Sequence, residues 1–178
     1  MEDFILREKK MYVQMTPDLL YDFTLYHTYS TFSGFMCIIL AFAVAIIGLI
    51  RVFSGQAHPH MIAFYGAAAL LFLAYTPLTL KIRSKSQVRD IEKYRERVEY
   101  IFDPAKGITM NYGDKSEFIP WEKCIKVVSS PKNMGIYYGK NEALILPKVQ
   151  FGDDFTEIMT VVMANVVGKV WKKEEVRQ

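Results

Sequence analysis

Two long uncharged segments restrict the fold of this chain more than any other feature. They cover residues 31–50 and 61–80, and neither contains Asp, Glu, Lys, Arg or His. A helix rises about 1.5 Å per residue, so each segment would span about 30 Å, the thickness of a bilayer's hydrocarbon core. A helix that is apolar on all sides either lies in the core of a large protein or crosses a membrane. The sequence therefore predicts a transmembrane hairpin, with spans at 31–50 and 61–80 and an external loop at 51–60.

Basic residues gather directly after the second span. Residues 81–97 carry seven Lys or Arg and three Asp or Glu, whereas the loop 51–60 carries only Arg51. Basic residues that flank a span are retained on the cytoplasmic side. We therefore expect a multi-pass protein of the cell membrane with both termini in the cytoplasm. Four of these residues are candidates for contact with anionic lipid headgroups, although the generic pattern favours ordinary topology retention as their explanation: Lys81, Arg83, Lys85 and Arg89.

Small side chains recur at helical spacing on one face of each predicted span. They are Ala41, Ala45 and Gly48 in the first span, and Ala63, Gly66, Ala67 and Ala74 in the second. Small residues let helix backbones approach closely in lipid, where no hydrophobic force draws helices together. We expect these two faces to form the packing seam of the hairpin.

The segments that flank the hairpin contain shorter elements. In residues 1–30, Met11, Val13 and Met15 alternate at the period of a strand. Thr16-Pro17-Asp18 then has the composition of a helix start, and this helix should lie along the inner interface of the membrane. Residues 81–97 contain good helix formers and predict a basic juxtamembrane helix.

The segment 98–178 changes to strand periodicity. Apolar residues alternate with polar ones from Val98 onward, and turn residues recur every eight to twelve positions, a spacing typical of an antiparallel meander. The predicted strands cover 98–103, 108–112, 118–121, 125–128, 136–138 and 143–146. An apolar stripe at helical spacing predicts a helix over 154–173. The predicted fold class is therefore membrane α+β, with a two-helix hairpin and a cytoplasmic antiparallel β-sandwich or partly open barrel capped by a C-terminal helix.

Three short motifs resemble those of a known family. They are Thr16-Pro17-Asp18-Leu19 with the residues up to His27, Phe118-Ile119-Pro120-Trp121-Glu122-Lys123-Cys124-Ile125, and Ala143-Leu144-Ile145-Leu146-Pro147-Lys148. Together with the order of the segments, they resemble the YcxB-like family of bacterial membrane proteins. The resemblance implies an inner-membrane location and a cytoplasmic domain with a fold like that of pleckstrin-homology (PH) domains, which have seven strands and a C-terminal helix. Because only six strands are predicted after residue 96, we hypothesise that residues 9–15 supply the seventh.

The sequence holds few groups suited to catalysis or metal binding. His58-Pro59-His60 offers two ligands, whereas a structural zinc site needs four. Cys124 has no His in the segment 98–178 with which to form a reactive pair, and we expect Cys37 and Cys124 to remain free thiols. Trp121, after Pro120, is either a residue that stacks on a ligand or a core aromatic, and its apolar context favours the core. We expect no cofactor, no metal and no enzymatic activity.

These observations favour a non-enzymatic, membrane-anchored binding or regulatory module. Residues 98–178 carry eleven basic and eleven acidic side chains, a balance that argues against nucleic acid as the partner. The expected partners are the anionic bilayer surface, a protein of unknown identity and, as an open alternative, further copies of the chain. Three other functions remain open: an oligomeric small transporter or channel, a membrane immunity or stress-protection protein, and an enzyme whose polar cluster only folding assembles.

Overall fold

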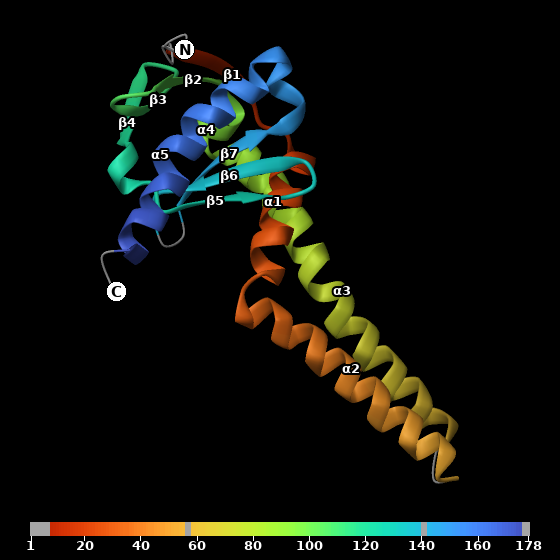
Figure 1. Cartoon of the computed structure of the whole chain (residues 1–178). Helices are drawn as coiled ribbons and strands as arrows, with labels where there is room; N and C mark the ends of the chain where they lie inside the picture. Colours follow the sequence, from red (N-terminus) through yellow and green to blue (C-terminus); the bar gives the residue numbers. More distant parts are fainter. Residues whose placement is uncertain (1–7, 56–57, 140–141, 176–178) are drawn as a thin grey trace. The chain divides into compact units, whose positions relative to one another are not determined.

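The computed structural model describes residues 8–55, 58–139 and 142–175, with side chains described as far as Val166 apart from Ser33. The predicted segments 1–30, 51–60 and 98–178 therefore each extend partly outside the described residues. The protein is α+β and divides into two compact units (Figure 1). The helical unit comprises residues 24–85, and the β unit comprises the residues before and after it.

Two long apolar helices make up most of the helical unit. They are α2 (Phe32–Phe53) and α3 (Pro59–Asp90), which run as a pair in Figure 1. The window Gly34–Phe53 has a mean hydropathy of 2.7 and α3 contains a window of 1.7, and only 11% and 6% of these windows are buried. The two predicted spans are therefore long helices of the required apolar composition, and most of their surface is uncovered within the chain.

The contact between α2 and α3 differs from the predicted seam. On α2, Ala41 is 1% exposed and Gly48 is buried, with its α-carbon so close to Tyr65 that an added Cβ would lie 2.9 Å from the Cβ of Tyr65. On α3, however, Ala63, Gly66 and Ala67 are all exposed, so the prediction for this helix is wrong. Small residues permit close approach but do not decide how a helix is rotated. Here a large tyrosine sits against a glycine, and the three small residues Ala63, Gly66 and Ala67 face elsewhere.

The β unit contains two antiparallel sheets rather than a closed barrel. The first has the order β1 (Lys9–Gln14), β2 (Arg97–Asp103), β3 (Gly107–Tyr112) and β4 (Lys115–Pro120). The second has the order β5 (Lys126–Ser129), β6 (Asn133–Tyr137) and β7 (Ala143–Pro147). Within each sheet, every strand pairs with its neighbour in sequence. The connections between paired strands are short, except that the whole hairpin separates β1 from β2.

The first strand confirms the hypothesis drawn from alternation. Met11 and Val13 are 3% and 2% exposed, whereas Tyr12 between them and Lys10 before them point outward, as the period of a strand requires. β1 pairs with β2 in the register Met11↔Tyr100 and Val13↔Val98. The helical hairpin is therefore inserted, in sequence, between the first two strands of one sheet.

Three further helices complete the fold: α1 (Pro17–Tyr29), α4 (Glu92–Arg95) and α5 (Phe155–Glu175). Short 3-10 turns lie at Trp121–Lys123, Lys148–Gln150 and Gly152–Asp154. The helix predicted over 154–173 corresponds to α5. Its residues Ile158, Val161, Val162 and Val166 are 0–1% exposed and join the core formed by the inward side chains of both sheets. Amphipathic periodicity thus places α5 against the sheets.

Several predicted boundaries are wrong, and the strand predicted over 136–138 is found as β6, which begins at Asn133. The segment 81–97 is not a separate helix. Its first part, up to Asp90, continues α3, because helix-forming residues follow Leu80 without interruption. The helix then breaks at Ile91, and the short α4 follows. Ile91 has the extended angles φ −99° and ψ 118°, and β2 begins at Arg97. The strand predicted over 118–121 ends at Pro120, and Trp121 begins a 3-10 turn.

Candidate functional site

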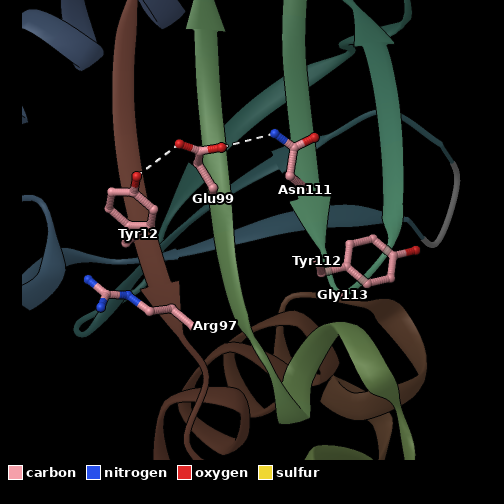
Figure 2. Close-up of a pocket in the computed structure, with 6 residues that line it drawn as sticks. All are labelled: Tyr12, Arg97, Glu99, Asn111, Tyr112 and Gly113. Atoms are coloured by element: carbon pink, nitrogen blue, oxygen red, sulfur yellow. Dashed lines mark hydrogen bonds between the residues drawn. The ribbon is translucent and has the colours of Figure 1, made fainter.

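A row of polar side chains crosses the outer face of the four-stranded sheet. Tyr12, Glu99, Asn111 and Ser116 are consecutive cross-strand partners on β1, β2, β3 and β4. The hydroxyl of Tyr12 donates to Oε1 of Glu99 at 2.9 Å, and Nδ2 of Asn111 donates to Oε2 at 3.0 Å (Figure 2). The hydroxyl of Ser116 donates to Oδ1 of Asn111 at 2.7 Å. One continuous hydrogen-bonded chain therefore links all four strands.

A hollow of about 320 Å³ lies at one side of this polar row. It is lined by Tyr12, Arg97, Glu99, Asn111, Tyr112 and Gly113 (Figure 2). The guanidinium carbon of Arg97 lies 4.7 Å from the centre of the Tyr12 ring, which is a cation–π geometry. Arg97 thus contributes a cationic wall, and the amide and carboxylate of the row contribute polar groups to the adjoining surface.

Glu99 is held as an anion at the centre of the row. Its hydrogen bonds from Asn111 and Tyr12 lower the pKa of the carboxyl below its ordinary value, and Nζ of Lys10 lies 3.7 Å from Oε1. The same contact with Glu99 raises the pKa of the Tyr12 phenol. Both groups are therefore fixed in their ordinary protonation states at neutral pH, and neither is tuned to exchange protons.

Tyr112, at the edge of the hollow, is also unsuited to proton transfer. Its hydroxyl donates a hydrogen bond to Oε1 of Glu117, and this bond raises the pKa of the phenol to about 12. A phenol with so high a pKa is a poor general acid or nucleophile at neutral pH. The arrangement suits the binding of a polar group beside Arg97 better than it suits catalysis.

The four predicted headgroup contacts all lie on α3. Lys81, Arg83, Lys85 and Arg89 are exposed, and the Nε of Arg89 pairs with Oδ1 of Asp90 at 2.9 Å. The polar hollow belongs to the β unit and includes none of the four.

Trp121 lies in the core of the β unit. It is 2% exposed, and its indole Nε1 donates to the backbone oxygen of Asp103 at 2.8 Å. A side chain so placed is not available to stack on a ligand, so the core alternative holds for Trp121. The neighbouring Pro120, which is partly buried, ends β4.

The other candidates from the sequence do not form a reactive cluster. His58 and His60 stack with ring centroids 5.5 Å apart. Cys37 and Cys124 are not joined by a disulfide. In residues 8–55, 58–139 and 142–175, no three His, Cys, Asp or Glu side chains are grouped so that they could hold a metal ion.

The polar row was missed in the sequence, although a signal for it exists. Tyr12, Glu99 and Asn111 each occupy the outward phase of a strand whose inward phase is apolar. The alternation identifies each residue as outward but does not show that the three stand opposite one another. That placement depends on strand register, which across β1 and β2 joins residues 87 positions apart.

Comparison with protein-family models, with curated proteins and with solved structures finds no match to this chain.

Proposed function

We propose that this chain is a membrane-anchored binding module without enzymatic activity. The α2–α3 hairpin crosses the cell membrane, both termini lie in the cytoplasm, and the β unit is presented there to a partner. Because the hairpin joins β1 to β2, the anchor is connected to the binding unit by two chain segments rather than by one terminal linker.

One observation carries this proposal: the apolar surface of α2 and α3 is uncovered. Phe42, Leu70 and Leu71 are 62%, 67% and 66% exposed, and many other large apolar side chains of both helices are also exposed. The core helix of a soluble protein would be mostly buried, whereas these windows are 11% and 6% buried. Each large apolar side chain moved from water into lipid contributes about 1.5–3 kcal/mol, so the two helices together favour the bilayer strongly.

The charges beside the hairpin support the orientation. Exposed Lys81, Arg83 and Lys85 follow the apolar part of α3, and the proposed headgroup contacts of such residues contribute about 1 kcal/mol each. At the opposite end of the hairpin, Arg51 in the last turn of α2 is the only Lys or Arg of residues 51–60. The asymmetry favours a cytoplasmic location for the end of α3 and for the β unit.

The β unit supports a binding role. The β unit has four strands in one sheet, three in the other and a C-terminal helix. This set of elements is compatible with the PH-like domain that the resemblance to the YcxB-like family implies. The fold alone does not specify function. The protonation states of Glu99, Tyr12 and Tyr112 favour contact over proton transfer at the polar hollow.

Alkaline extraction of membranes from cells that express the chain tests the anchor. The protein should stay in the membrane pellet with integral proteins. Leu71→Arg places a charge on the exposed apolar surface of α3 and should reduce the retained fraction, whereas Val149→Arg, at a 78% exposed site in the β unit, should not. Release of the unaltered chain into the alkaline supernatant would refute the proposal.

The second candidate function is a small transporter or channel. It would have to be an oligomer, because the two helices of one chain cannot enclose a pore alone. The exposed small residues Ala63, Gly66 and Ala67 on α3 favour contact with another apolar helix. Disulfide crosslinking of Gly66→Cys, in a chain with Cys37 and Cys124 replaced by Ser, tests for copies that meet at this face. Flux through liposomes that contain crosslinked protein would favour the transporter.

A further inference from the structure

The α5–β5 groove is an apolar trough on the β unit, separate from the polar hollow. We define it by Val127, Val128, Met134, Phe155, Met159 and Met163. It encloses about 350 Å³ and continues into a second hollow of about 560 Å³ that shares Phe155, Met159 and Met163. Phe155 and Met163 are 40% and 47% exposed, so the trough is open to an occupant. From residue 155 to 163 α5 advances about 12 Å, the length of three to four strand residues.

Strand β5 lies at an edge of its sheet beside this groove. In the described residues β5 pairs with β6 alone, so its other backbone edge is not used by a strand. Ile125, at the start of this edge, is 54% exposed. This edge can take up another extended segment, whose backbone would bond to the edge and whose alternate side chains would enter the groove. Because β5 has only four residues and carries Lys126, the added segment would be short and would meet a positive charge.

The strand side of the groove is rich in lysine, although the carboxylate of Asp22 accepts hydrogen bonds from Ser130 and from the backbone N–H of Lys132 in the turn between β5 and β6. Residues 123–139 contain Lys123, Lys126 and Lys132 and no Asp or Glu, and Lys148 lies at the wall of the groove. All of the lysines in 123–139 are exposed. An occupant with carboxylates would therefore be attracted and a basic one repelled. Three methionines nearby, Met134, Met159 and Met163, can adapt to apolar side chains of different shapes.

We propose that the α5–β5 groove binds an extended segment of a partner protein in which apolar residues alternate with Asp or Glu. The segment adds to β5 as a fourth strand of that sheet, places its apolar side chains against Met159 and Met163, and directs its carboxylates toward the lysines. This assignment rests on the proposed function, since it names the partner chemistry of the binding module.

Selection from a random peptide display library on the full chain in detergent tests the assignment. The selected peptides should alternate apolar with acidic residues and bind in fluorescence anisotropy. A lysine-for-acid version, and a version N-methylated on the backbone amides that would face β5, should each bind about ten-fold more weakly or less. Met163→Glu, at an exposed position of the groove, should weaken binding by at least about ten-fold.

Phe118→Glu is the matched control, because Phe118 is 54% exposed but lies on β4 in the other sheet. It should leave binding unchanged. The assignment is overturned if no peptide is selected, if the selected peptides are basic or lack alternation, if N-methylation has no effect, or if Met163→Glu binds as the unaltered chain does. It is also overturned if the groove is filled by a second copy, seen as a detergent-solubilised dimer that Met163→Glu converts to a monomer. None of these peptide-binding results changes what alkaline extraction measures. Failure of the groove assignment is therefore distinguishable from failure of the proposed membrane anchor.

Discussion

Gly135 offers the sharpest test of packing in the β unit, because any larger residue at this position of β6 requires the ring of Phe23 to shift. A Cβ added there would lie 2.3 Å from Cε2 and 2.6 Å from Cζ of Phe23, and 3.2 Å from Cγ2 of Val128. Phe23 is 5% exposed and its ring lies 6.1 Å from that of Tyr137. Helix α1 thus inserts an aromatic ring into the space that Gly135 leaves, and Gly135→Ala must displace the ring.

The expected cost follows from two limits. Overpacking that the core absorbs by small shifts costs about 1–3 kcal/mol, whereas losing a buried Phe altogether costs about 3–5 kcal/mol. Since a separation of 2.3 Å cannot be absorbed by a small shift, we expect Gly135→Ala to lower the free energy of unfolding by about 3 kcal/mol. In a Phe23→Ala background the ring is absent, and the same substitution should cost less than about 1 kcal/mol.

Denaturant unfolding of the β unit in the detergent-solubilised full chain measures both values. Trp171→Phe leaves Trp121, which is buried, as the only tryptophan and thus as the fluorescence probe. Gly66→Ala is the matched control, because no atom lies within 4 Å of the position its Cβ would occupy, and it should leave the transition unchanged. Equal costs of Gly135→Ala with and without Phe23 would refute the proposed fit of ring to glycine.

Further predictions concern the hydrogen bonds of the β unit. Trp121→Phe removes the indole bond to the oxygen of Asp103 and should lower the free energy of unfolding by about 1–3 kcal/mol in circular dichroism melts, and an unchanged melt would contradict this role. Asn133→Asp places a carboxylate where Nδ2 now donates to Asp22 at 3.0 Å, so the variant should be most unstable at neutral pH and partly recover on acidification. Because hydrogen bonds lower the folded pKa of Glu99, its contribution to stability is present above the ordinary pKa of 4.5 and is lost as pH falls through the folded value. Glu99→Gln should therefore flatten the loss of stability on acidification, whereas Glu122→Gln, at an exposed site, should keep the slope of the unaltered chain.

Features of this fold that depend on local periodicity could be predicted from the sequence. The alternation of Met11 and Val13 identified β1 because successive side chains of any strand point to opposite faces. The apolar composition of α2 and α3 is likewise a property of consecutive residues. Such patterns need no knowledge of what lies across the fold.

Features that depend on residues distant in sequence could not be predicted. The rotation of α3 that presents Tyr65 to Gly48 is set by the fit of both helices, and the small residues alone indicated the wrong face. The polar row of Tyr12, Glu99 and Asn111 exists only through strand register. The carboxylate of Asp22 likewise accepts hydrogen bonds from Ser130 at 2.6 Å and from Asn133, more than a hundred positions away.

Cysteine labelling in spheroplasts tests the membrane hairpin most directly. The experiment uses a chain in which Cys37 and Cys124, the only native cysteines, are replaced by Ser. Ser54→Cys lies between α2 and α3, and Lys132→Cys lies in the turn between β5 and β6, and both positions are exposed. A membrane-impermeant maleimide should label Ser54→Cys in sealed spheroplasts and should label Lys132→Cys only after the membrane is opened. Labelling of both positions, or of Lys132→Cys alone, before the membrane is opened would contradict the account.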